Sequence, residues 1–247
     1  MQGQVIKKIL QKKFNKNHFS KKNLSKISKS LKKEQKKYDI HLCGGDTTFS
    51  NKLSFTIISL GYSKSIVYRN KSRLNDDIYV TGNLGDSFIG LQILKDKIKV
   101  NNKISQYFIK KYYEPDLQLK FINSLLKLAN TSIDISDGLI DDLKKMINRQ
   151  SVSFHIFDKN IPISNTLSQL IEIKKFKKIN ITSRGDDYQI LFTASPIKSR
   201  IIKKISKNTG VKITKIGKII SGKNRSKIIS IKNKQIEAKN KGYIHQF

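Results

Sequence analysis

The sequence has very little cysteine, proline and tryptophan. Its 247 residues include one cysteine, three prolines and no tryptophan. A single cysteine excludes a disulfide framework and a site of clustered thiolate ligands for a metal, and it fits a reducing cytoplasm. That residue, Cys43, lies in the apolar run 40–43, so we predict a buried small side chain rather than a catalytic thiol.

Long apolar runs are also missing. No stretch approaches the roughly 18 consecutive apolar residues of a membrane-spanning helix. The N-terminal region has no uninterrupted apolar segment of the kind found in signal peptides, because Lys7, Lys8, Lys12 and Lys13 interrupt it. We therefore predict neither export nor a membrane partner, and we predict a cytoplasmic location.

Acidic residues are few, and the basic excess is large. Against 18 Asp and Glu stand 50 Lys and Arg, a net charge of +32. These residues are mostly lysine and are spread along the chain, without a zinc-finger, RNA-recognition or arginine–glycine pattern. Abundant Lys, Ile and Asn together are what an AT-rich coding sequence produces, so we predict no specific nucleic-acid partner. A basic nucleic-acid-binding protein stays open as an alternative, because such a charge favours polyanions at low salt.

Apolar positions at strand and helix spacing alternate along the chain, which indicates an α/β fold. Residues 1–19 are basic, weakly patterned and unlike a strand, and residues 69–77 are a polar linker. Strands are predicted at 40–43, 53–62, 78–82 and 189–193, and short strands are predicted near the end of the chain. Helices are predicted from 20 to 38, from 85, from 115, from 139 to 147 and from 198 to 209.

The segment 133–139, Ile-Asp-Ile-Ser-Asp-Gly-Leu, is the most informative stretch. It predicts a strand, a tight turn and a helix whose N-terminus Ser136 or Asp137 caps. Backbone N–H groups and the helix dipole at such a turn favour phosphate. Asp134 and Asp137 would repel that phosphate unless a hard cation lay between them, so the segment predicts phosphate and Mg²⁺. Taken alone, it also fits an ordinary capped helix.

Similar glycine-bearing turns occur elsewhere, and we expect them to meet at one cleft. Carboxylates there would hold Mg²⁺, glycines would admit phosphate oxygens, and a cation such as Arg69 would neutralise charge in the transfer. No Walker A pattern is present, which excludes a P-loop enzyme. The turns are Gly44–Thr47, Thr81–Ser87, Asp134–Gly138 and Gly185–Tyr188.

In matching order over residues 20–247, the blocks LCGGDTT, YVTGNLGDSFIGL, IDISDGLIDDL, RGDDYQILFT and KGYIHQF resemble those of thiamine-monophosphate kinases. This resemblance implies the two-layer α/β (α+β) fold of the aminoimidazole ribonucleotide synthetase superfamily. It implies a homodimer that transfers a phosphate directly from ATP to thiamine monophosphate with Mg²⁺. A partial N-terminal ATP-binding domain would cover residues 1–73, and a nearly complete C-terminal domain residues 74–247.

The same resemblance implies residue roles. Catalysis and magnesium binding fall on Asp137, with Asp46 and Asp134 as further magnesium ligands. Substrate contacts fall on Asp186, where the family usually has the longer Glu, and on Tyr243. The ATP-binding residues would be Gly45, Asp46, Arg69 and Ser136.

The chain also departs from the family. It lacks a preceding segment with a Gly-Asp-Asp-Ala turn and a Thr-Asp pair, which supply other magnesium ligands and half of a dimer-spanning barrel. Residues 114–118 lack two arginines that the family carries there. Two alternatives to the kinase therefore stay open besides nucleic-acid binding: a truncated, inactive remnant, or a subunit that needs a separate N-terminal half. A sister activity of the superfamily is disfavoured by the IDISDGL and DYQILFT blocks.

Overall fold

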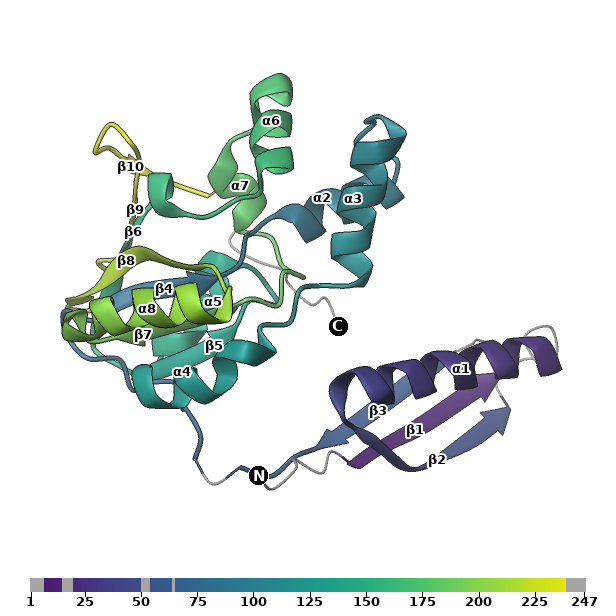
Figure 1. Ribbon diagram of the computed structural model, residues 1–247. Helices are drawn as coiled ribbons and strands as arrows, with labels where there is room; N and C mark the ends of the chain where they lie inside the picture. Colours follow the sequence, from purple (N-terminus) through teal and green to yellow (C-terminus); the bar gives the residue numbers. More distant parts are fainter. Residues whose placement is uncertain (1–6, 15–19, 50–53, 64, 239–247) are drawn as a thin grey trace. The chain divides into compact units, whose positions relative to one another are not determined.

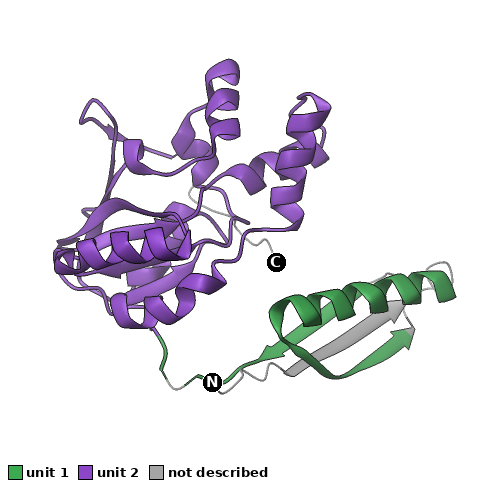
Figure 2. Ribbon diagram, in the orientation of Figure 1, with its two compact units in different colours: residues 1–66 green, residues 67–247 purple. Residues whose placement is uncertain are grey.

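The chain folds into two units, residues 1–66 and 67–247 (Figures 1 and 2). A computed structural model describes residues 7–14, 20–49, 54–63 and 65–238. The linker predicted at 69–77 belongs to the second unit, since the Asn70 N–H donates to the Met146 carbonyl at 2.8 Å and the Arg149 N–H donates to the Asn70 side chain at 2.9 Å. The assignment of an ATP-binding domain to residues 1–73 stays a prediction.

The first unit is a helix with a three-stranded sheet. The sheet has the order β2-β1-β3, with β1 parallel to β2 and antiparallel to β3. Ser20 begins the helix as predicted, because its hydroxyl accepts the Asn23 N–H at 3.1 Å. The elements are β1 (Lys7–Phe14), α1 (Lys21–Tyr38), β2 (His41–Phe49) and β3 (Ser54–Leu60).

Three expectations for this unit were wrong. Residues 7–14 form a strand, because pairing with neighbours on both sides outweighs their weak pattern. The predicted turn Gly44–Thr47 is the middle of β2, where the backbones of Gly45 and Asp46 pair with β1. Cys43 is exposed rather than buried. The strand predicted at 53–62 is confirmed by β3.

The second unit is built on a seven-stranded sheet of order β10-β9-β6-β8-β4-β7-β5. Neighbouring strands are antiparallel except β6 and β9, which are parallel. The strands are β4 (Asp77–Thr81), β5 (Thr131–Asp134), β6 (Val152–Phe157), β7 (Ile190–Ala194), β8 (Ile213–Ser221), β9 (Lys227–Ile229) and β10 (Gln235–Ile236). The helices are α2 (Asp86–Leu94), α3 (Asn102–Tyr113), α4 (Ile122–Leu128), α5 (Leu139–Ile147), α6 (Asn165–Lys174), α7 (Lys178–Thr182) and α8 (Ser199–Thr209), with 3₁₀ turns at 119–121, 158–160 and 196–198.

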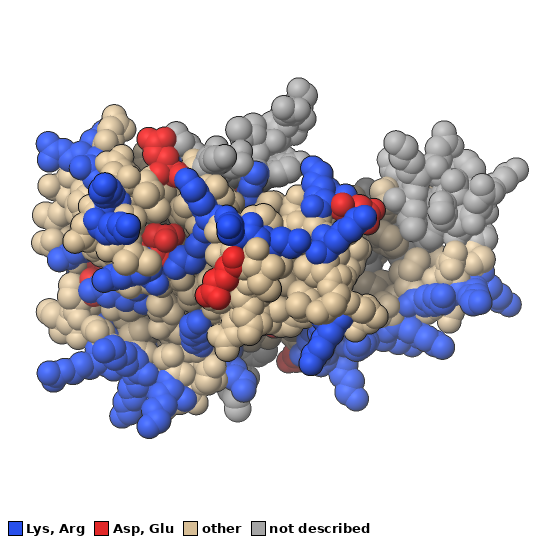
Figure 3. Space-filling view, turned by 90° about the horizontal axis from the view of Figure 1, so that it is seen from above, with Lys and Arg blue, Asp and Glu red and all other residues tan. Residues whose placement is uncertain are grey.

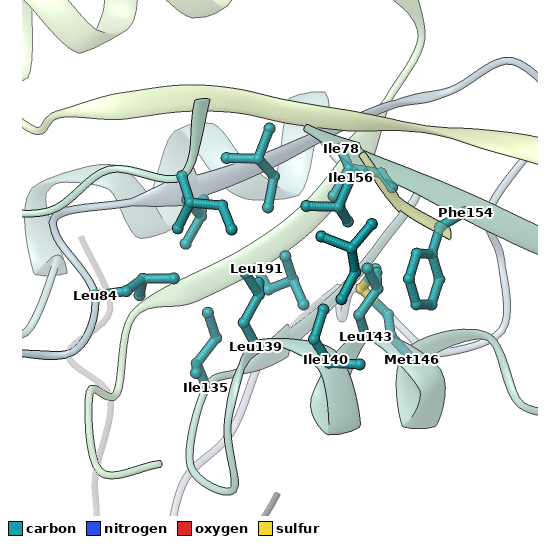
Figure 4. Packing of buried hydrophobic residues seen from close by; sticks show 14 of the residues in the cluster. Ile78, Leu84, Ile135, Leu139, Ile140, Leu143, Met146, Phe154, Ile156 and Leu191 are labelled. Carbon is teal, nitrogen blue, oxygen red and sulfur yellow. The ribbon is translucent and has the colours of Figure 1, made fainter. Parts of the chain in front are cut away.

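Alternating side chains of the strands build a core on each face of this sheet. Ile78 and Leu191 pack against α5, whose Leu139 and Leu143 point toward the strands in Figure 4. Their neighbour in β4, Tyr79, faces the other side with residues of α4 and α8. Each fully buried aliphatic side chain contributes about 1.5–3 kcal/mol of transfer free energy. The period of two in β4 and β7 and the helical spacing in α5 thus determine which face of each element is buried.

A separate apolar cluster joins α2, α3, α6 and α7, with Ile89 and Phe108 fully buried in it. The sequence did not predict α3, α6 or α7. The helix predicted from Pro115 was placed too early, because the Asp116 carbonyl accepts the Gln189 side chain at 3.0 Å and that stretch is tied to the turn before β7. In the described residues, no helix has both the length and the apolar composition required to cross a membrane.

Candidate active site

Three of the four predicted turns meet at one end of the second unit's sheet. The Ser136 carbonyl accepts the Asp186 N–H at 2.9 Å, and the Ile135 carbonyl accepts the Tyr188 N–H at 2.8 Å. The Asp187 carboxylate accepts the Gly85 N–H at 3.0 and 2.8 Å. The turns at 81–87, 134–138 and 185–188 are therefore held together by backbone hydrogen bonds and one buried carboxylate.

Two glycines make this approach possible. A β-carbon on Gly138, whose φ is +128°, would lie 2.2 Å from the Ser183 carbonyl oxygen. A β-carbon on Gly185 would lie 1.9 Å from the Ser136 carbonyl oxygen. Both contacts are with backbone, which cannot move aside as a flexible side chain would. The glycines of the two motifs are thus explained by the packing of one turn on the other.

A cavity of about 670 Å³ opens beside the joined turns. We call it the Asp137 cavity. Its aromatic side chains are Phe88, Tyr112 and Tyr188, and Ser136 also lines it. Its charged side chains are Lys95, Asp137, Arg184 and Asp186. Apolar rings beside a few charged groups are typical of sites for small organic ligands.

The N-terminus of α5 differs from the prediction. Gly138 is the N-cap residue, and neither Ser136 nor Asp137 caps the helix with its side chain. Instead the buried Asp142 reaches back, and its Oδ2 accepts the N–H groups of Asp137 at 2.9 Å and Gly138 at 3.0 Å. These two N–H groups are used within the protein, so they do not form the phosphate site that the sequence predicted.

Lys145 lies close to three carboxylates near the N-terminus of α5. Its Nζ contacts the Asp137 carboxylate and lies 2.9 Å from Asp141 Oδ2 and 3.7 Å from Asp142 Oδ1. The hydrogen bond with Asp137 is the main reason why the pKa of Lys145 is raised. Burial raises the pKa of Asp142, against the two backbone N–H groups that lower it. Asp137 therefore faces the cavity with its charge already balanced by an ammonium group.

Asp186 and Tyr188, which also line the cavity, have unusual backbone conformations. Asp186 has φ +68° and Tyr188 has φ +50°, in the left-handed region that few non-glycine residues adopt. Burial, and then the charge of Asp137, raise the pKa of Asp186. Left-handed residues gather at functional sites because the surrounding structure holds them there. The hydrogen bonds from Asp186 and Tyr188 to the 134–138 turn are that restraint.

The predicted magnesium ligands do not form a preformed metal cage. Within the described residues, no group of three or more His, Cys, Asp and Glu side chains is placed to hold a metal ion. Asp134 is exposed at the end of β5 and is not among the residues that line the cavity. Asp137 and Asp186 do share the cavity, and Mg²⁺ that arrives with phosphates needs only one or two protein carboxylates. The two carboxylates of Asp137 and Asp186 fit an Mg²⁺ ion that arrives with the phosphates of a nucleotide.

The remaining predicted site residues belong to the first unit, to the segment before β4 or to the end of the chain. Gly45 and Asp46 are exposed on β2 in the first unit, where Asp46 Oδ1 accepts the Thr47 N–H at 2.7 Å. Arg69 is exposed in the segment before β4 and does not line the cavity. Tyr243 lies outside the described residues. Ser136, Asp137 and Asp186 are thus the predicted residues that the structure brings together.

Sequence reasoning missed several residues of the cavity. Arg184 directly precedes the Gly185–Tyr188 turn, so its place in a motif was the available signal. Phe88 and Lys95 come from α2 and Tyr112 from α3, and only their tertiary packing brings them to the turns. Lys145 lies eight residues after Asp137, and its ion pair with Asp137 depends on how the chain enters α5, which the sequence pattern does not give.

Curated proteins and solved structures show what the chain is similar to. It is 36% identical over 225 residues to the thiamine-monophosphate kinase of Buchnera aphidicola subsp. Schizaphis graminum, a match covering 90% of this chain and 69% of that protein. The crystal structure of thiamine monophosphate kinase from Aquifex aeolicus matches with a TM-score of 0.80 at 24% identity, over 95% of this chain and 76% of that one. A structure of AaThiL complexed with AMPPCP and TMP matches with a TM-score of 0.81 at 24% identity, over 98% and 75%.

A comparison with family models found no match. The likeness to the solved structures confirms the α/β fold of the aminoimidazole ribonucleotide synthetase type that the sequence predicted. The Buchnera relative exceeds 30% identity, and this chain spans more than two thirds of its length. With the blocks of residues that meet at the Asp137 cavity, this identity shows that the chain belongs to the thiamine-monophosphate kinase family.

Proposed function

We propose that this protein transfers a phosphate group from ATP to thiamine monophosphate and forms thiamine diphosphate. One observation carries the proposal: Ser136 and Asp137 from one family motif and Asp186 from another line a single cavity. The relatives that share these motifs are named thiamine-monophosphate kinase. The AaThiL structure of the same fold is a complex with AMPPCP and TMP, an ATP analogue and a second ligand.

The cavity offers both aromatic and charged side chains. Phe88, Tyr112 and Tyr188 supply aromatic surface for the rings of the acceptor. Asp186 would hold the thiamine part. Positioning of donor and acceptor is the main contribution of a protein to direct phosphoryl transfer. The proposed reaction has no covalent intermediate on the enzyme.

We include Mg²⁺ as the cofactor, held by Asp137 and by the phosphates of the nucleotide. When bound, such an ion neutralises charge on the phosphoryl oxygens. On the protein side, the Asp137 carboxylate forms an ion pair with Lys145 of α5. Binding of Mg²⁺ by Asp137 would replace this ion pair. Asp134 and Asp46 as further ligands, and Gly45, Arg69 and Tyr243 as contacts of ATP and substrate, stay predictions from the family resemblance. So do the homodimer and the cytoplasmic location.

The face of the molecule that Figure 3 shows does not favour the nucleic-acid alternative. In the space-filling view of Figure 3, Lys and Arg side chains are scattered over the visible face among uncharged residues. Sequence-independent binders of nucleic acid instead line a groove with basic and aromatic side chains. The family membership likewise favours a kinase over a basic binding protein.

Replacement of one carboxylate tests the proposal. Asp137→Asn should abolish thiamine diphosphate formation from ATP and thiamine monophosphate, measured by chromatography of the thiamine products. Glu172→Gln removes the same charge from an exposed position of α6 and should leave the rate unchanged. Full activity of Asp137→Asn would show that the assignment of Asp137 is wrong. A folded but inactive parent chain would support the remnant or the two-part alternative instead.

A further inference from the structure

Two cations, Arg184 and Lys95, line the Asp137 cavity. Asp137 is balanced by Lys145. Within the part of the chain that the structure describes, no ion pair is formed by Arg184 or Lys95. Both line the cavity with Asp186, where burial raises the pKa of the carboxyl and the charge of Lys95 lowers it. The charge that faces a ligand here is on balance positive.

Arg184 contacts the Phe88 ring and has one buried N–H donor, Nε, without an acceptor among the described residues. Its guanidinium lies 5.3 Å from the centre of the Phe88 ring, and its backbone N–H donates to the Ile181 carbonyl at 3.0 Å. Its Nε is buried and has no hydrogen-bond partner among the described residues. A buried donor without an acceptor is rare in proteins and needs a partner such as a water, an ion or a ligand. Because Arg184 lines the Asp137 cavity, a ligand bound there can supply that acceptor.

The anion that fits is a phosphate group. Two N–H groups just before α5, those of Asp137 and Gly138, are taken by Asp142. A guanidinium presents a planar N–H edge, and that edge matches two phosphate oxygens. Lys95 at the end of α2 supplies a second positive charge on the same cavity.

We propose that Arg184 is a phosphate-binding residue of the Asp137 cavity, assisted by Lys95. The inference rests on the proposed function for its choice of ligands, and it deepens that function by naming the side chain that recognises the phosphate. The ligand class is a phosphorylated compound with an aromatic ring. The phosphate is that of the acceptor or one of those of the nucleotide, and both share this chemistry.

Binding to the full chain separates these sources without any turnover. Thiamine, thiamine monophosphate and AMPPCP are titrated by calorimetry into the parent chain, Arg184→Gln, Arg184→Lys and Arg200→Gln. The last variant loses the same charge from an exposed position of α8 outside the cavity. A lost hydrogen bond to a charged group corresponds to a drop of roughly 10- to 100-fold in affinity.

We expect Arg184→Gln to lower the affinity for thiamine monophosphate by this factor and to leave the affinity for thiamine unchanged. Arg184→Lys should recover part of the lost affinity for thiamine monophosphate. Loss of AMPPCP binding alone would keep the inference and assign the phosphate to the nucleotide. Unchanged binding of both phosphorylated ligands, equal loss for thiamine, or no binding to the parent chain would overturn it. If Arg184→Gln does not fold, Arg184→Lys and Lys95→Gln decide by the same criteria. A chain that binds in this way but transfers no phosphate would contradict the proposed function and not this inference.

Discussion

The contact between Gly138 and the Ser183 carbonyl predicts a large effect from one methyl group. In Gly138→Ala the new carbon would lie 2.2 Å from a backbone oxygen, at a φ of +128°. The backbone conformation costs about 1–3 kcal/mol for a residue other than glycine. Overpacking adds about 1–3 kcal/mol, since a backbone carbonyl cannot rotate away. We expect the free energy of unfolding to fall by about 3–5 kcal/mol.

Gly210→Ala is the matched control. Gly210 ends α8 with φ +70°, and a β-carbon there would meet nothing within 4 Å. Only the left-handed backbone is strained, at about 1 kcal/mol. Urea denaturation followed by circular dichroism measures both, and with a typical slope the difference is a shift of about 1–2 M in the midpoint. Equal midpoints for the two variants would refute the argument that the two turns are packed backbone against backbone.

Two further predictions concern charges near the cavity. Burial raises the pKa of Asp187 well above its ordinary value of 3.8, so the folded state holds its proton more tightly than the unfolded state. The stability of the parent relative to Asp187→Asn should therefore be greatest below about pH 4 and should fall as the pH rises. Parallel curves of unfolding free energy against pH would contradict it. Lys145 bridges partly exposed carboxylates, so Lys145→Met should cost about 1 kcal/mol or less at low salt. The loss should shrink in 1 M NaCl, where exposed charges are screened within about 3 Å, and a loss independent of salt would argue against an electrostatic role.

The sequence was sufficient wherever local pattern and tertiary packing agree. Leu139 and Leu143 recur at helical spacing and lie on the face of α5 that meets the sheet. The Gly185 turn was found because a strand follows it directly. Strand β1 was missed because its backbone pairing, and not its side chains, decides its conformation.

The sequence predicted individual residues of the site, but it did not predict the hydrogen bonds and the packing that join them. Ser136, Asp137 and Asp186 belong to compact motifs, and those motifs meet as expected. The sequence did not predict that Asp142 accepts the N–H groups of Asp137 and Gly138, because a prediction of capping looks to the residues before the helix, here Ser136 and Asp137. Among the aromatic side chains that line the cavity, Tyr112 comes from α3, and the sequence did not predict this helix.

Transfer of labelled phosphate tests the central claim most directly. Chain incubated with thiamine monophosphate, Mg²⁺ and ATP labelled on its terminal phosphate should produce thiamine diphosphate that carries the label on its outer phosphate, together with an equal amount of ADP. Label found only in inorganic phosphate, or in no thiamine compound, from a chain shown to be folded would contradict the claim that this protein is a thiamine-monophosphate kinase in activity as well as in family.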